Sequence, residues 1–187
     1  MRSFSTLLIA AVAALAGPSA QAQTRDGFFV GFGAGWGSAS VGSDAGDADE
    51  REGSVTAHAR VGTAIGDRTL AGVELNGWFD SEDDASLSLF NTTVALYFYP
   101  ADSGLFVKGG AGLSRADFEL GGDNASGIGW GLMAGLGYDF AISDSTAVTP
   151  MATFWYGKPG NLKLDGIEVL QGFNHNVVEV AVGITFY

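Results

Sequence analysis

Alternation of apolar residues with small or polar ones, at a period of two, constrains the fold of this chain more than any other feature. Successive side chains of a β-strand point to opposite faces, whereas the apolar residues of an amphipathic helix recur about every 3.6 residues. The period-two pattern recurs in eight segments, at residues 27–37, 54–65, 70–79, 87–99, 105–116, 127–140, 147–156 and 174–187. The sequence therefore predicts an all-β chain of eight strands.

The connections between these segments alternate in length. Short connections lie at 66–68, 100–103 and 141–146, and longer, mostly acidic ones lie at 38–53, 80–86, 117–125 and 157–173. Short turns at one end and long loops at the other are typical of an up-and-down barrel. We therefore predict an eight-stranded antiparallel up-and-down β-barrel. Its even number of strands places both termini at the end with the short turns.

The shortest connection also predicts how two strands pair. If residues 66–68 form a three-residue turn, Ile65 lies opposite Thr69 and Arg60 lies opposite Glu74. The only two charges of this hairpin then meet on one face of the sheet, which predicts an inward ion pair between Arg60 and Glu74.

The amount of charge decides which face of the strands looks outward. Only 16% of the residues are charged, against about 25% in an average soluble domain. A soluble, lipocalin-like barrel is apolar inside and charged outside, whereas the non-apolar face here is mostly Gly, Ser, Thr and Asn. We therefore predict a transmembrane barrel with a narrow lumen filled by side chains. The predicted polar network of the lumen consists of Arg60, Glu74, Lys108, Asp139 and Glu179.

The first 22 residues have the pattern of a signal peptide. Arg2 precedes a ten-residue apolar run at 7–16, and residues 20–22 (Ala-Gln-Ala) supply a cleavage signature. Ten helical residues span about 15 Å, half of what a bilayer core needs. We expect residues 1–22 to be removed on export and residues 23–187 to form the barrel domain. Since no later segment reaches 18 uninterrupted apolar residues, the chain is expected to cross a membrane by strands.

The net charge of −12 and the absence of cysteine exclude several classes of function. Nucleic-acid binding needs a basic surface, and disulfides, thiolate metal sites and cysteine nucleophiles need cysteine. Most acidic residues fall in the long connections, where clustered carboxylates are candidate ligands for Ca²⁺ or Mg²⁺. The weak candidates are Asp44, Asp47, Asp49, Asp83 and Asp84, whose spacing does not match an EF-hand. Solvated loops are the simpler expectation, and no cofactor is expected.

Two features suggest chemistry but lack the context that the chemistry needs. The glycine repeats at 31–37 and 127–131 have a strict period of two inside strands, so we interpret them as lumen-facing residues rather than phosphate-binding loops. His58 and His175 are the only histidines, and neither is followed by a serine two residues on. Glu179 lies four residues from His175, about 13 Å along a strand and too far for contact. No catalytic residue is predicted.

The predicted signal peptide, the eight alternating segments and three sequence stretches resemble the outer-membrane β-barrel domain family, which includes small barrels similar to OmpA, OmpW and OmpX. The stretches are GVELNGWF at 72–79, FVKGGAGLSRA at 106–116 and VAVGITFY at 180–187. The resemblance implies a monomer in the outer membrane of a Gram-negative bacterium, in contact with membrane lipid and lipopolysaccharide. It also implies that the barrel-insertion machinery recognises a C-terminal aromatic residue. Tyr187 is the terminal aromatic, but the lipid-facing alternation ends on Phe186, so both are candidates.

Three functions are compatible with this pattern. We expect a non-enzymatic integral outer-membrane protein with a structural or surface-interaction role, in which the acidic outer loops form the contacting surface. The first alternative is an OmpW-like narrow conduit or binding barrel for a small apolar molecule. The second alternative is a lipid A-modifying enzyme, which the absence of a His-x-Ser arrangement disfavours.

Overall fold

The structure is a computed structural model that describes residues 27–187 except 45, 48–50, 84 and 165–166. The predicted signal peptide, residues 1–22, lies outside the described residues. The long strands are β1 (Phe28–Ser43), β3 (Glu52–Gly66), β4 (Thr69–Glu82), β5 (Ala85–Phe98), β6 (Leu105–Leu120), β7 (Asp123–Tyr138), β9 (Thr146–Leu164) and β10 (Ile167–Phe186). Two short strands, β2 (Gly46–Asp47) and β8 (Phe140–Ser143), pair with β1 and β9.

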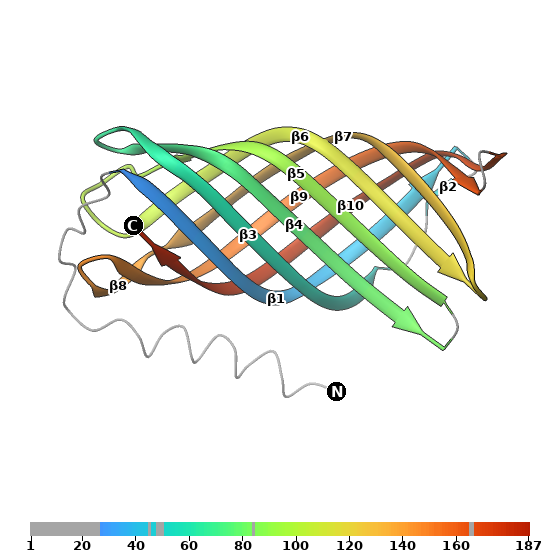
Figure 1. Ribbon diagram of the computed structural model, residues 1–187, viewed down its shortest axis with the longest axis horizontal. Coiled ribbons are helices and arrows are strands. Elements are labelled where there is room, and N and C mark those ends of the chain that lie inside the picture. Colours follow the sequence, from blue (N-terminus) through green and yellow to red (C-terminus); the bar gives the residue numbers. More distant parts are fainter. Residues whose placement is uncertain (1–26, 45, 48–50, 84, 165–166) are drawn as a thin grey trace.

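Antiparallel pairing runs around the sheet without a break. Neighbouring long strands pair in chain order, and β10 pairs with both β9 and β1. The sheet is therefore closed into an eight-stranded up-and-down barrel, which confirms the predicted fold class. The start of β1 and the end of β10 lie at the same end of the barrel as the turns of the β3–β4 and β5–β6 hairpins (Figure 1). We call this end the inner rim and the opposite end the outer rim.

The long connections predicted for the outer rim are too long, because the strands continue into them. β6 and β7 pair as far as Leu120 and Asp123. Gly121 and Gly122 join them as a two-residue turn, in which φ values of 59° and 95° suit glycine. The same extension shortens all four predicted connections, at 38–53, 80–86, 117–125 and 157–173. At the inner rim, the predicted connection at 141–146 is a short hairpin between β8 and β9.

The β3–β4 hairpin confirms the predicted register except at its turn. Arg60 lies opposite Glu74, as expected. Gly66 rather than Ile65 pairs with Thr69, so Ile65 is an extra residue that forms an irregularity in the ladder. The turn is therefore one residue shorter than the sequence suggested, while the faces of the two strands remain as predicted.

The burial pattern confirms which face of the strands looks outward. Large apolar side chains on the outer surface are about half exposed, among them Phe32, Trp36, Val94, Leu113, Ile128 and Val182. The five charged residues of the predicted lumen network are each at most 5% exposed. This distribution is the reverse of a soluble barrel, and it fits a wall in contact with lipid. Among the described residues, no helix is long and apolar enough to span a membrane.

Candidate functional site

The candidate site is the polar lumen, and its first part is a buried ion pair near the inner rim. Lys108 on β6 places its Nζ 2.5 Å from Oε1 of Glu74 on β4, and both side chains are completely buried. Tyr97, on the intervening strand β5, donates its hydroxyl to Oε2 of the same carboxylate at 2.6 Å. Both oxygens of Glu74 are therefore hydrogen-bonded, which offsets the cost of removing the two charges from water.

Arg60 forms the second ion pair, with a different partner from the predicted one. Its Nη2 lies 3.7 Å from Oδ1 of Asp139 and donates to the hydroxyl of Thr185 at 2.5 Å. The predicted Arg60–Glu74 ion pair is therefore wrong, although the two residues are cross-strand neighbours. Lys108 binds Glu74, and the longer Arg60 side chain extends across the lumen toward β10. Register fixes which backbones are adjacent, but in a narrow barrel side chains also meet across the lumen.

Five aromatic side chains pack around these ion pairs. The guanidinium carbon of Arg60 lies 5.5 Å and 5.3 Å from the ring centroids of Tyr97 and Phe106. Tyr97 also meets Phe29 edge-on at 5.5 Å, and Tyr99 meets Phe106 at 5.4 Å. Together they form what we call the inner cluster: Phe29, Arg60, Glu74, Tyr97, Tyr99, Phe106, Lys108, Asp139 and Tyr187.

The two candidate assembly residues at the C-terminus lie on opposite faces of the wall. Phe186 is 43% exposed on the outer surface. Tyr187 follows it on the lumen side, where its hydroxyl donates to Oδ2 of Asp139 at 2.5 Å and lies 3.1 Å from the hydroxyl of Tyr99. The alternation of a strand explains this difference. Recognition of either residue by the insertion machinery stays a prediction.

Glu179, in the middle of the lumen, has fewer partners than the carboxylates of the inner cluster. Thr56 donates to its Oε1 at 2.9 Å, and Nδ1 of His58 lies 3.8 Å from the same oxygen. Its Oε2 has no hydrogen-bond partner among the described residues. The His58 ring lies where two glycines leave room, because a Cβ at Gly33 or Gly183 would come within 3 Å of it. The glycine repeat thus accommodates a lumen side chain, in agreement with its interpretation from sequence.

The structure brings together a serine and a histidine that sequence reasoning did not connect. Oγ of Ser114 on β6 lies 2.9 Å from Nε2 of His175 on β10, and both residues are completely buried. Gly157 permits this contact, since a Cβ at that position would overlap both side chains. Nδ1 of His175 has no partner among the described residues, so no carboxylate completes a Ser-His-acid triad. No local sequence signal predicts the pair, because only closure of the barrel brings β6 and β10 together.

Most of the unpartnered polar atoms of the lumen lie toward its middle and its outer half. Within the described part of the chain, such atoms occur on His58, Arg60, Asn76, Asn91, Thr153, Trp155, His175 and Glu179. Buried polar groups in proteins are normally hydrogen-bonded to protein or to ordered water. We define the outer cluster as His58, Asn76, Asn91, Ser114, Thr153, Trp155, His175 and Glu179. Its buried polar atoms have fewer described protein partners than those of the inner cluster.

The structure describes only some of the predicted acidic cation ligands. Asp44 and Asp83 are exposed in two different hairpins, and Asp47 lies in β2. Asp49 and Asp84 lie outside the described residues. Where the chain is described, no three His, Cys, Asp or Glu side chains gather into a metal site. Binding of Ca²⁺ or Mg²⁺ at these acids stays a prediction.

An antiparallel barrel with an apolar wall and a polar, filled lumen defines a protein that crosses a membrane by strands. Residues 7–186 match the model of the outer membrane protein beta-barrel domain family, and the chain belongs to that family. It is therefore a protein of the Gram-negative outer membrane, as the sequence resemblance implied.

Solved structures are similar to the chain in fold. Neisserial surface protein A, from Neisseria, has a TM-score of 0.56 and 19% identity, with 86% of this chain and 97% of that chain covered. Ail, the attachment invasion locus protein of Yersinia pestis, has a TM-score of 0.55 and 16% identity, with 86% and 99% covered. At these identities the likeness concerns the fold alone. No curated protein matches the chain.

Proposed function

We propose that the barrel is non-enzymatic and closed to solutes, and that it acts through the surface it presents at the outer rim. The observation that carries this proposal is the filling of the inner half of the lumen. An eight-stranded barrel has an interior only wide enough for side chains or one small ligand. The inner cluster occupies that space with two ion pairs and five aromatic rings, and Phe29, Tyr97, Tyr99 and Phe106 are each at most 2% exposed.

A non-enzymatic role is supported by the placement of Ser114 and His175. A lipid A-modifying enzyme needs its nucleophile and base where lipid can reach them. Both residues are instead completely buried in the lumen, and the histidine has no acidic partner among the described residues. Unchanged lipid A in cells that overproduce the protein is the expected result, and a new lipid A species would contradict this part of the proposal.

The described outer rim offers an acidic surface for interaction. Its exposed carboxylates are Asp44, Glu52, Glu82, Asp83, Glu119, Asp123 and Glu168. A hollow between the β4–β5 and β6–β7 hairpins brings two of them, Asp83 and Glu119, to one surface. Because the outer hairpins continue the wall, these charges project beyond the apolar band. Glu168 is paired with Lys163 at 3.8 Å, but exposed acids outnumber exposed bases at this rim. An excess of one sign attracts partners of the opposite sign, so we propose a basic protein surface as the partner.

Binding of poly-L-lysine to the purified protein in a zwitterionic detergent tests this role. We expect salt-sensitive binding that weakens roughly tenfold when Glu82, Asp83, Glu119 and Asp123 are changed to their amides. Asp67→Asn with Asp144→Asn, which changes two exposed acids of the inner rim, is the control, and its loss is compared per charge removed. Equal loss in the control, or no loss in the outer-rim variant, would contradict a directed acidic surface.

Uptake into proteoliposomes separates this proposal from an OmpW-like conduit. A closed lumen predicts that a small apolar molecule enters protein-containing and protein-free liposomes at the same rate. Faster entry in the presence of the protein would favour the conduit instead. The measurement is independent of the poly-L-lysine experiment, so the two halves of the proposal can fail separately.

The proposal includes export by residues 1–22 and assembly through the C-terminal strand. Phe186 lies on the outer, lipid-facing surface, in phase with the other apolar residues of β10. We expect Phe186→Ala to lower the yield of heat-modifiable protein in the outer membrane, and Tyr187→Phe to leave that yield nearly unchanged. The opposite order would assign recognition to Tyr187.

A further inference from the structure

The outer surface of the wall changes from apolar to polar at a defined level near the outer rim. On β6, the segment whose outward residues are apolar runs from Leu105 to Leu113. This segment has nine residues, about the length that a tilted membrane strand needs. The last outward apolar residues of the neighbouring strands β5 and β7 are Phe90 and Ile128. The next outward positions on these three strands are Ser88, Arg115 and Ser126.

The first polar residues beyond this level are neutral or cationic on seven of the long strands and in the residue just before the eighth, β3. The neutral ones are Ser38, Ser81, Ser88, Ser126 and Asn176. The cationic ones are Arg51, Arg115 and Lys158. No described acid takes one of these first positions, although the rim beyond them is acidic. This change of sign at the edge of the apolar band matches a layer of anionic lipid headgroups.

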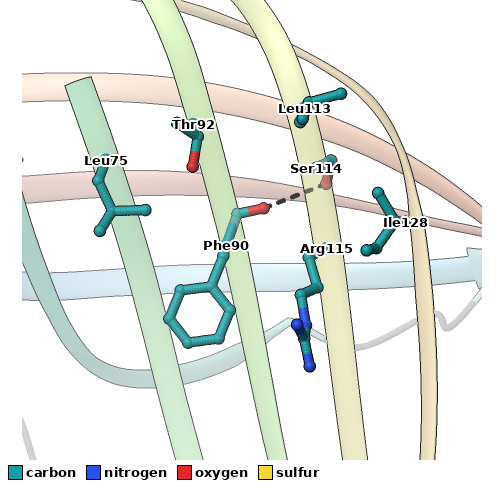
Figure 2. Close-up of a pocket in the computed structure, with 7 residues that line it drawn as sticks. All are labelled: Leu75, Phe90, Thr92, Leu113, Ser114, Arg115 and Ile128. Carbon is teal, nitrogen blue, oxygen red and sulfur yellow. Dashed lines mark hydrogen bonds between the residues drawn. The ribbon is translucent and has the colours of Figure 1, made fainter. Parts of the chain in front are cut away.

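A groove in the lipid-facing wall lies directly below one of these cations. It has a volume of about 250 Å³, and its lining includes Leu75, Phe90, Leu113, Arg115 and Ile128. Thr92 lies between its cross-strand neighbours Leu75 and Leu113, and its short side chain leaves the depression between them (Figure 2). The groove is apolar along its length and polar at one end, which suits an acyl chain attached to a charged headgroup.

Arg115 lies at the polar end of the groove with part of its guanidinium free to bind. Its side chain is 54% exposed, and in Figure 2 it extends along β6 away from Leu113. Asp117 accepts from Nε and Nη2 at 2.7 Å each, which fixes the orientation of the group. Nη1 has no described hydrogen-bond partner. By contrast, Arg51 donates hydrogen bonds from Nε, Nη1 and Nη2 to Ser38 and Asn176.

Lys158 supplies a second cation close to the groove. Trp130 on β7 pairs with both Leu113 on β6 and Lys158 on β9. Lys158 therefore lies on the strand next to β7, whose Ile128 lines the groove. Its side chain is exposed and has no described partner. The rings of Trp130 and Tyr156 lie 5.4 Å apart just below it, as is usual for aromatic residues at a membrane interface.

We propose that Arg115 and Lys158, together with the groove beside Thr92, bind a phosphorylated glycolipid of the outer leaflet. Its phosphate groups contact the two cations, and one acyl chain occupies the groove. A soluble polyanion is a poorer match, because it would meet the carboxylates of the rim and leave the apolar groove empty. The site does not depend on the lumen being closed, so the proposal stands apart from the proposed function.

Binding of bisphosphorylated lipid A to the purified protein in detergent, followed by native mass spectrometry, tests the site. Arg115→Ala removes a charge-assisted hydrogen bond to the phosphate, so we expect it to weaken binding roughly tenfold. The double variant, Arg115→Ala with Lys158→Ala, is expected to weaken binding further. Removal of the phosphates from the lipid is expected to weaken its binding to the unmodified protein by as much as the double variant does. Arg68→Ala is the matched control, because Arg68 is 50% exposed and ion-paired with Asp102, but lies at the inner rim.

Each outcome decides for or against the site. Selective loss in the Arg115 and Lys158 variants, with Arg68→Ala unchanged, supports it. Unchanged binding in the double variant, or equal loss in the control, overturns it. Competition by sucrose octasulfate, a soluble polyanion without acyl chains, at concentrations as low as those of lipid A would also overturn it. Arg115→Gln, which keeps the side chain polar, replaces the alanine variant if that variant lacks heat-modifiable mobility.

Discussion

The inner and outer clusters of the lumen differ in how completely their buried polar groups are hydrogen-bonded. Both bury ionisable groups inside a closed barrel. In the inner cluster both oxygens of Glu74 have partners, and aromatic rings fill the remaining space. In the outer cluster one oxygen of Glu179, one nitrogen of His175 and the indole nitrogen of Trp155 have no described partner.

The difference indicates which half of the lumen is more completely hydrogen-bonded, since Nε of Arg60 is the only described side-chain atom of the inner cluster in the unpartnered set. A buried charge is stable when it is paired and its remaining lone pairs are hydrogen-bonded. Buried polar atoms without a partner instead cost folding free energy. We therefore interpret the inner cluster as the structural closure of the barrel and the outer cluster as an extension with fewer hydrogen bonds. The same substitution, Glu to Gln, made in each cluster tests this difference.

Glu74→Gln is expected to have the largest effect. It leaves Lys108 buried without a charged partner, and breaking a buried ion pair costs about 3–5 kcal/mol of unfolding free energy. Urea titration of tryptophan fluorescence in lipid vesicles measures the change. A loss below about 1 kcal/mol would mean that water already reaches Lys108 and that the inner cluster is not dry.

Tyr97→Phe is expected to have an intermediate effect. The change removes the hydroxyl that donates to Oε2 of Glu74 but keeps the ring that packs against Phe29 and Phe106. A hydrogen bond to a charged group contributes about 1.5–3 kcal/mol. The same titration checks the value, and combining Tyr97→Phe with Glu74→Gln gives a double-mutant cycle. Strict additivity of the two losses would show that the hydroxyl and the carboxylate are not coupled.

Glu179→Gln, the matched substitution in the outer cluster, is expected to change stability by no more than about 1 kcal/mol in either direction. The amide keeps the acceptor for Thr56, and the change removes a buried charge whose second oxygen has no described partner. A loss as large as that of Glu74→Gln would remove the distinction between the two clusters.

Arg68→Ala is expected to have the smallest effect. Arg68 and Asp102 form an exposed ion pair at the inner rim, with an Nη2–Oδ1 distance of 3.0 Å. Exposed pairs contribute about 0.2–1 kcal/mol and are screened by salt. The unfolding free energy at low and high salt measures this contribution. A loss of several kcal/mol would show that the inner rim, rather than the lumen, holds the barrel together.

The sequence predicted the parts of this structure that depend on local pattern. The period-two alternation located the eight strands and their outward faces, and the β3–β4 turn placed Arg60 opposite Glu74. The length of the outer hairpins was missed, although Gly121-Gly122 is itself a signal for a two-residue turn. The acidic residues around it were instead interpreted as a loop.

The contacts across the lumen were not predictable from local pattern. The pairing of Lys108 with Glu74 spans an intervening strand, and that of Ser114 with His175 spans the barrel. Such contacts depend on the closure of the sheet and on glycines, such as Gly157, that leave room for a side chain from another strand. A single sequence identifies which residues face inward, but not which of them meet.

Single-channel recording of the purified, refolded protein in planar lipid bilayers shows whether the lumen is closed. Because the inner cluster fills the lumen with ion pairs and aromatic rings, the unmodified barrel is expected to give no conductance steps above the bilayer baseline. Reproducible channels from the unmodified protein would contradict a closed lumen and favour a conduit.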